Sequence, residues 1–267
     1  MIKFTHKHFF LPVFFFFFAR VDALRSSDRG YDRGSKGGKD RGRGRDRRPD
    51  GRRGRPQRKR RDTGRAAGAV LDHLQAESLI PVLYFCFSRK ECEIKGERNQ
   101  HRRLLKASER AKLEELFAEI CATFELDPKS DLALQQILKR GRCGIGYHHA
   151  GMLPIHKEVV ERLFTSGLLR MLFTTETFAL GINMPARTVV FDSLRKFDGV
   201  SFDYMGARDY MQMAGRAGRQ GLDDEGLVIS LLDDEALVEA PLSDLFGGKV
   251  EPVMSRFNLS YSTILNL

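Results

Sequence analysis

The chain has 267 residues, of which 42% are hydrophobic, enough to build the core of one or two domains. Its net charge of +10 belongs to one segment: residues 25–65 hold 18 lysines and arginines against 6 acidic residues, so the rest of the chain carries −2. The four cysteines form no C-x-x-C pair and have no histidine at zinc spacing, which argues against a zinc site and favours free thiols in a reducing compartment.

Residues 1–24 have the pattern of a secretory signal peptide: Lys3 and Lys7 precede an apolar run over 9–19, and the small residue Ala23 follows. The run is too short for a membrane-spanning helix. Five consecutive phenylalanines are unusual in a signal peptide, and the sequence downstream has an intracellular character, so a misassigned start is the alternative. We expect an intracellular protein, in cytoplasm or nucleus, without membrane association.

Residues 25–68 are rich in glycine, arginine and aspartate and contain almost nothing apolar. Burial within such a segment cannot offset the conformational entropy of ordering it, so we predict a disordered basic tail. Two interpretations remain open. The segment is either a solvated linker or an arm that neutralises nucleic-acid phosphates without sequence preference. Tyr31 offers the only ring for stacking, so electrostatics would dominate such an arm.

Residues 69–250 alternate short apolar runs with longer amphipathic ones, which predicts an α/β domain built on a parallel sheet with helices on both faces. The predicted strands are 81–87, 168–174, 188–193 and 226–232, and the predicted helices are 108–122, 131–140, 155–166 and 207–216. Such sheets bind ligands beyond the carboxyl ends of their strands. The loops after Phe87 and Thr174 and around 144–154 are therefore the places to look for chemistry.

Those loops carry hydroxyls, small residues and cations at helix starts, which suit phosphate. The candidates are Ser88, Arg89, His148, His149, Gly151, Thr174, Thr175, Thr177, Gly181 and Asn183. Each has a plainer interpretation. The threonines can cap strand ends, and the two histidines can be ordinary loop residues, because no third metal ligand is spaced nearby. We expect no metal site of the chain's own.

The stretch "YMQMAGRAGRQG" (210–221) predicts a helix on which Gln212, Arg216 and Arg219 share one face, at i, i+4 and i+7. Gly215 and Gly218 would lie on a neighbouring face and let another backbone come close. Two guanidinium forks on one rigid face suit a polyanion such as a triphosphate, whose transition state spreads charge over the γ-phosphoryl oxygens. The alternative is a basic helix end without function.

Four segments resemble the later helicase motifs of superfamily 2, in the right order: "VLYFCFSRKECE", "GYHHAGMLPIHKEVVERLF", "LFTTETFALGINMPARTVVFD" and "YMQMAGRAGRQG". These motif sequences are most similar to those in the second RecA-like domain of Superkiller-like DExH RNA helicases. The resemblance covers roughly residues 80–267. The resemblance implies that Arg216 and Arg219 act as arginine fingers and that Gln212, Gly181 and Asn183 touch the nucleotide. It also implies a nucleic-acid-binding face made by Ser88, Arg89, His149, Gly151, Thr175 and Thr177.

The same resemblance implies ATP with Mg²⁺ as cofactor, held mainly by a first RecA-like domain of the same protein. It implies RNA as substrate, with DNA possible, and an RNA-degradation complex as partner. The chain lacks the phosphate-binding G-x-x-x-x-G-K-[ST] motif and the acidic pair that holds Mg²⁺. "GSKGGKD" (34–40) has the wrong spacing, and "DEAL" (234–237) lies on the wrong side of the arginine motif.

We therefore expect the C-terminal motor domain of an ATP-dependent RNA helicase in a partial chain that is inactive alone. Residues 251–267 resemble the start of a winged-helix region, which suggests a cut C-terminus. Two alternatives stay open. One is a non-catalytic nucleic-acid-binding protein made of a degenerate motor lobe and a basic arm. The other, a secreted basic protein, depends on the N-terminus alone.

Overall fold

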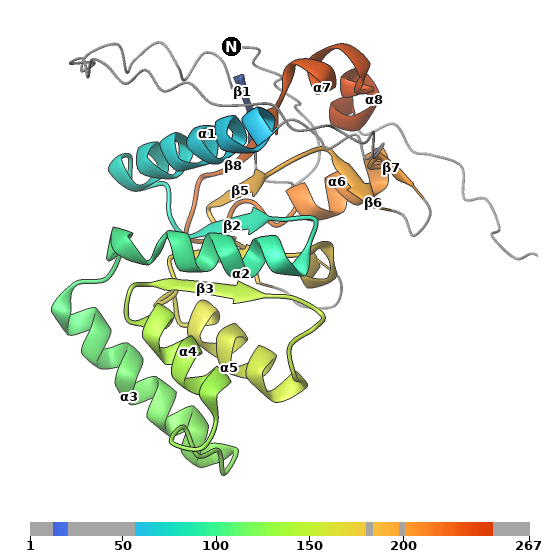
Figure 1. Ribbon diagram of the computed structural model, residues 1–267. Helices are drawn as coiled ribbons and strands as arrows, with labels where there is room; N and C mark the ends of the chain where they lie inside the picture. Colours follow the sequence, from blue (N-terminus) through green and yellow to red (C-terminus); the bar gives the residue numbers. More distant parts are fainter. Residues whose placement is uncertain (1–12, 21–56, 180–183, 198–200, 248–267) are drawn as a thin grey trace, which may run out of the picture.

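The computed structural model of the chain describes residues 13–20, 57–179, 184–197 and 201–247 (Figure 1). Its main sheet is parallel throughout, with the strand order β1-β8-β5-β2-β4-β3. The strands are β1 (Val13–Arg20), β2 (Val82–Phe85), β3 (Ile145–His148), β4 (Met171–Thr174), β5 (Thr188–Phe191) and β8 (Glu225–Leu232). A separate antiparallel hairpin pairs β6 (Arg195–Phe197) with β7 (Phe202–Tyr204).

Helices cover both faces of the sheet, as the composition of a strand such as β2 requires. In β2, Leu83 and Phe85 enter one hydrophobic core, whereas Val82 and Tyr84 enter the other, and all four side chains are fully buried. Alternate residues of a strand point to opposite faces, so a strand with this composition needs helices on both sides. The predicted α/β fold with a doubly covered parallel sheet is confirmed.

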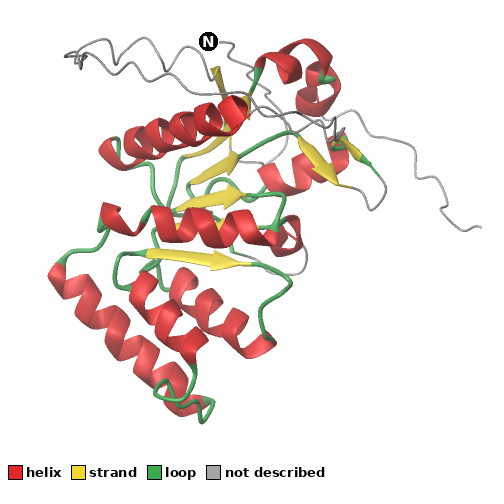
Figure 2. Cartoon of the chain, viewed as in Figure 1, coloured by secondary structure: helices red, strands yellow, loops and turns green. Residues whose placement is uncertain are grey.

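The helices divide between these two cores. One face packs against α1 (Gln57–Ala76) and α2 (Arg89–Arg98). The other packs against α3 (Ala107–Thr123), α4 (Leu132–Gly141), α5 (Pro154–Thr165), α6 (Ala207–Ala214), α7 (Asp234–Glu239) and α8 (Leu242–Gly247). Two short 3-10 helices complete the described elements, η2 (Gln100–Arg102) and η3 (Glu176–Ala179). Figure 2 shows the β6–β7 hairpin beside α6, apart from the main strands.

The four predicted strands and four predicted helices are present, with ends that differ by a few residues. Strand β3 was not predicted, because Gly146 and His148 interrupt its apolar pattern. Gly146 has a packing reason, since a Cβ there would lie 2.9 Å from Leu169 Cδ1. The hairpin was also not predicted, because its strands have only three residues each.

The predicted segment boundaries fall partly outside the described residues. Most of the basic segment 25–68 and all of 251–267 lie there. Helix α1 begins at Gln57 and so includes the last residues of the basic segment. Within the part of α1 whose side chains are described, Leu71 and Leu74 pack against the sheet. Among the described helices, none combines the length and apolarity that crossing a membrane requires.

Candidate nucleic-acid and nucleotide interface

Three of the predicted site loops meet at one edge of the sheet. Strands β2 and β3 both pair with β4, so the loops that follow Phe85, His148 and Thr174 leave three neighbouring carboxyl ends. The backbone N–H of Thr175 donates to the carbonyl of His148 at 3.3 Å and joins two of these loops directly. These loops therefore lie together at the carboxyl ends of the strands.

Ser88 begins helix α2 as its N-cap. Its Oγ accepts a hydrogen bond from the backbone N–H of Glu91 at 3.1 Å. The capped turn leaves Arg89 at the first helical position, and both Ser88 and Arg89 are exposed. A cation and free backbone N–H groups at a helix start form an arrangement that suits an anionic oxygen.

Arg89 lies against the loop that follows β3. A Cβ added at Gly151 would lie 3.1 Å from Arg89 Cδ and 3.3 Å from its Nη1, so the absence of a side chain lets the arginine cross this backbone. The N–H of Gly151 donates to Nδ1 of His149 at 3.1 Å. The residues of α2 and of the 149–151 loop that were predicted to contact nucleic acid thus form one cluster.

His149 is held from three sides. Because Nδ1 accepts from Gly151, the ring proton is on Nε2, which donates to Glu93 Oε1 at 3.1 Å. Its ring stacks on Tyr147, with centroids 5.4 Å apart and planes 4° from parallel. Burial lowers the pKa of His149, against the opposing effect of Glu93, and so favours this neutral form.

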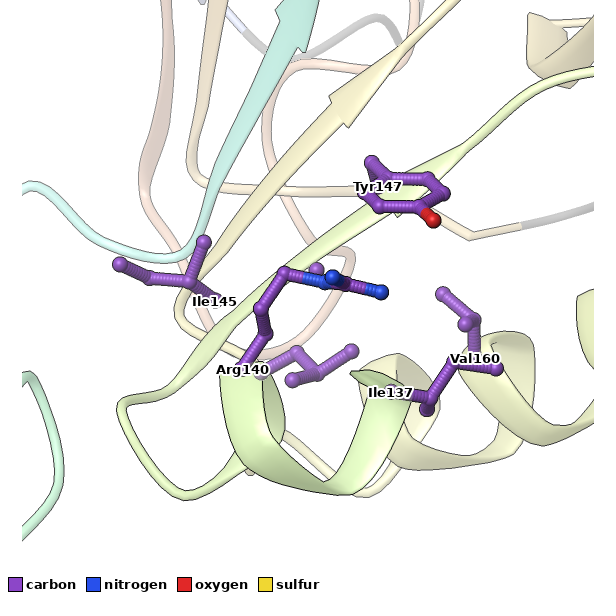
Figure 3. Close-up of a pocket in the computed structure, with 7 residues that line it drawn as sticks. Ile137, Arg140, Ile145, Tyr147 and Val160 are labelled. Atoms are coloured by element: carbon purple, nitrogen blue, oxygen red, sulfur yellow. The ribbon is translucent and has the colours of Figure 1, made fainter. Parts of the chain in front are cut away.

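The stack continues to Arg140, whose guanidinium carbon lies 4.3 Å from the centre of the Tyr147 ring (Figure 3). A hollow surrounds this contact, lined by Ile137, Arg140, Ile145, Gly146, Tyr147, Val160 and Leu169. It has no space for a water molecule, so it is a packing feature that supports Tyr147 and not a ligand site.

His148 points away from this cluster. Its Nε2 lies 2.6 Å from Glu161 Oε1 on α5, and its ring meets Phe178 edge-on at 4.8 Å. Its Nδ1 is buried without a hydrogen-bond partner in the described part of the chain. Burial lowers the pKa of His148 and outweighs the neighbouring carboxylate. This residue ties β3 to α5, and its backbone carbonyl, not its side chain, reaches the site.

The threonine loop after β4 presents two hydroxyls together. Thr175 Oγ1 and Thr177 Oγ1 lie 3.0 Å apart; Thr175 is half-buried and Thr177 is exposed. Thr174 is fully buried, and its hydroxyl donates to the carbonyl of Thr175 at 3.2 Å. Thr174 therefore matches the interpretation as a strand-end residue. Gly181 and Asn183 lie outside the described residues.

The prediction that one helix carries Gln212, Arg216 and Arg219 is wrong. Gln212 is exposed on α6, but the helix ends at Ala214, and both arginines follow it in a loop. A competing backbone pairing ends the helix: Ala186 donates its N–H to the Arg216 carbonyl at 2.9 Å and accepts from the N–H of Gly218 at 2.7 Å.

Gly218 has a role that the prediction did not give it: its φ of +86°, which side chains disfavour, permits the turn that follows the helix. A close backbone approach involves Gly226, near the start of β8. A Cβ there would lie 2.6 Å from the carbonyl carbon and oxygen of Ala217. Gly226 thereby fixes the backbone between the two arginines.

Arg219 is paired with the carboxylate of Asp223, which was not predicted from the sequence. Asp223 receives hydrogen bonds from Arg219 Nε and Nη2, both at 2.8 Å, and from the Arg219 backbone N–H at 3.0 Å. The hydrogen bond that Arg219 donates to Asp223 raises the pKa of Arg219 and lowers the pKa of Asp223. An acidic residue four positions after an arginine was the available sequence signal.

The candidate residues therefore form two groups. The first, with Arg89, His149 and Thr175, lies at the carboxyl ends of the strands. The second, with Arg216 and Arg219, lies near the amino ends of β5 and β8, because its backbone pairs with Ala186 just before β5. Helix α6 packs against η3 at the first group and leads to the second group at its C-terminal end.

The chain is similar in sequence to several known proteins. Residues 116–221 match the helicase conserved C-terminal domain. The chain is 43% identical over 198 residues to Exosome RNA helicase MTR4 of Homo sapiens, covering 74% of this chain and 19% of that protein. It is 44% identical over 202 residues to Superkiller complex protein 2 of Mus musculus, covering 74% and 16%.

A third relative is the DExH-box ATP-dependent RNA helicase DExH9 of Arabidopsis thaliana, 40% identical over 222 residues, which cover 78% of this chain and 22% of that protein. The chain thus spans less than a quarter of the length of these relatives. The resemblance stated from the motifs is confirmed. The chain belongs to the DExH-box RNA helicase family, whose conserved C-terminal helicase domain it carries.

Proposed function

We propose that this chain is the second motor domain of an ATP-dependent RNA helicase. It would bind the RNA backbone along the carboxyl ends of β2, β3 and β4 and supply Arg216 and Arg219 to ATP held by a first RecA-like domain. The observation that carries the proposal is the gathering of Arg89, Gly151 and the paired hydroxyls of Thr175 and Thr177 at one sheet edge.

The chemistry of this edge suits a nucleic-acid backbone. Ser88, Arg89 and Thr177 are exposed, and Gly151 adds an exposed stretch of backbone without a side chain. Hydroxyls, backbone N–H groups and a guanidinium are the usual donors to phosphate and sugar oxygens. None of them reads a base, so the binding would be independent of sequence. RNA is favoured over DNA because these relatives are named as RNA helicases.

The second group suits a nucleotide. Arg219 already grips two carboxylate oxygens with a two-pronged contact, and the same fork geometry matches two oxygens of a phosphate. Gln212 and Arg216, with Gly181 and Asn183, would complete the nucleotide face. ATP and Mg²⁺ would be held mainly by the first RecA-like domain, since this chain has no phosphate-binding lysine motif of its own.

We further propose an RNA-degradation complex as the partner of the whole protein. This proposal is supported by the names of two relatives, one an exosome RNA helicase and the other a Superkiller complex protein. Within such a helicase, closure of the two motor domains on ATP and reopening after hydrolysis would exchange the RNA contacts in each cycle.

Salt-dependent binding tests the strand-binding half of the proposal. We expect the chain to bind a fluorescent polyuridine RNA. The Arg89→Ala variant should bind this RNA more weakly, and the slope of log affinity against log salt concentration should fall by about one. The matched control is Arg162→Ala on α5, an exposed arginine paired with Glu158, which should leave both quantities unchanged.

Three outcomes would redirect the proposal. Equal binding of a deoxyuridine strand would extend the substrate to DNA. An Arg89→Ala variant with the same affinity and slope as the unaltered chain would show that this edge does not hold the backbone. If a protein joining this chain to a first RecA-like domain binds RNA without hydrolysing ATP, the chain is a non-catalytic binding domain.

A further inference from the structure

Lys196 joins the two halves of the candidate site. It lies on β6, and its side chain is 23% exposed. Its Nζ donates to Asp209 Oδ2 on α6 at 2.5 Å and to Glu176 Oε2 on η3 at 3.2 Å. One ammonium group therefore contacts two elements that are far apart along the chain.

The two acceptors occupy informative positions. Glu176 lies between Thr175 and Thr177, whose hydroxyls form part of the proposed strand-binding edge. Asp209 lies in the first turn of α6, three residues before Gln212, and this helix continues to the loop that carries Arg216. Lys196 thus contacts both the proposed RNA-binding loop at 175–177 and the start of the helix that leads to the arginines.

The cation offsets the repulsion between these two carboxylates. Because both oxygens contact the same nitrogen, the two carboxylates lie within about 6 Å of each other, a separation at which like charges repel. Although burial lowers the pKa of Lys196, the hydrogen bonds to Asp209 and Glu176 outweigh this effect and raise it. The ammonium is charged throughout the neutral range, and its removal would leave two carboxylates facing each other.

The neighbouring residue Arg195 has a different task. It extends from the same strand toward α7, where its guanidinium donates to Glu235 and Glu239, each at 2.8 Å. Its side chain is 30% exposed, which is close to the value for Lys196. Arg195 is therefore a matched control, because it is an adjacent cation on the same hairpin that contacts neither η3 nor α6 in these ion pairs.

We propose that Lys196 is a positioning residue that couples RNA contact at the 175–177 loop to the placement of helix α6. This inference rests on the proposed function, because it assigns a route between its two halves. A strand that binds Thr175 and Thr177 fixes Glu176 between them. Lys196 then carries that constraint to Asp209 and along α6 toward Gln212 and Arg216.

Hydrogen exchange of the chain with and without a polyuridine RNA tests the coupling. In the unaltered chain, RNA should slow amide exchange both in η3 and in α6. In Lys196→Met, which keeps the length and removes the charge, RNA should still protect η3 but should no longer protect α6. Lys196→Arg should restore the protection of α6, and Arg195→Met should behave like the unaltered chain.

Asp209→Asn gives a second test that leaves Lys196 in place. It weakens only the helix side of the bridge, so α6 should again lose its RNA-dependent protection while η3 keeps it. Circular dichroism melting confirms that each variant is folded. Equal protection of α6 in the unaltered chain and in Lys196→Met, or no protection of α6 in any form, would overturn the coupling role. An unaltered chain that binds no RNA would instead overturn the proposed function.

Discussion

Arg219 donates two side-chain hydrogen bonds of 2.8 Å each to Asp223, four residues later in the chain. The Asp223 side chain is only 4% exposed, so its negative charge is stabilised mainly by Arg219 and little by water. We predict that Asp223→Ala lowers the free energy of unfolding by about 1–3 kcal/mol, the usual range for a hydrogen bond to a charged group. Urea unfolding at neutral pH measures this loss.

Glu158→Ala is the control, since Glu158 and Arg162 form an ion pair with the same four-residue spacing on the surface of α5. That pair is exposed, so its loss should change stability by about 0.5 kcal/mol or less. The pKa of Asp223 is lowered in the folded state. The contribution of Asp223 should therefore be complete above its unfolded pKa and disappear as the pH falls through the lower, folded value. Equal losses in the two variants would contradict a special role for the buried pair.

Gly226→Ala should be far more damaging than an ordinary glycine substitution. Its new Cβ would lie 2.6 Å from the backbone of Ala217, which cannot yield as a flexible side chain can. We expect a loss of about 1–3 kcal/mol or more in thermal or urea unfolding, together with displacement of the loop between Arg216 and Arg219.

Gly68→Ala provides the comparison. Gly68 lies within helix α1, and a Cβ there meets no atom within 4 Å. Because alanine favours the helix, this variant should gain about 0.5–1 kcal/mol. Similar stabilities of the two variants would show that Ala217 and Gly226 do not pack as described.

Acidification should weaken the fold through two histidines. Burial lowers the folded pKa of both His148 and His149, so the unfolded chain takes up protons more readily than the folded one. Stability should be constant above the unfolded histidine pKa of about 6.5 and fall as the pH drops from there through the lower, folded values.

Urea unfolding at a series of pH values between neutrality and mild acid measures this effect. His149→Gln should reduce the pH dependence, because it removes one of the two contributing groups. A stability that is independent of pH over this interval, or that rises on acidification, would show that neither ring is held in its neutral form.

Much of the fold could be predicted because its signals are local. Runs such as those of β2 and β5 are apolar at consecutive positions, and the cap at Ser88 needs only its own helix. Strand β3 could not be predicted in this way. Gly146 reads as a loop residue, and its reason for being in a strand is the nearby side chain of Leu169, which only the assembled sheet brings there.

The candidate site divides in the same manner. The grouping of Arg89, Gly151 and Thr175 follows from the rule that loops at the carboxyl ends of neighbouring parallel strands meet. The end of α6 does not follow from local helix periodicity. It depends on Ala186, about thirty residues earlier, whose backbone pairs with Arg216 and Gly218. The bridging role of Lys196 likewise needs the tertiary positions of Glu176 and Asp209.

ATP turnover by a two-domain protein tests the central claim most directly. This chain would be joined to a first RecA-like domain that carries the G-x-x-x-x-G-K-[ST] motif, and RNA-stimulated phosphate release would be measured. Arg216→Ala should reduce turnover by about 10³ with a much smaller change in ATP binding, because an arginine finger stabilises the transition state. Arg208→Ala, an exposed arginine in the first turn of α6, should keep normal turnover. Normal turnover in Arg216→Ala would contradict the account.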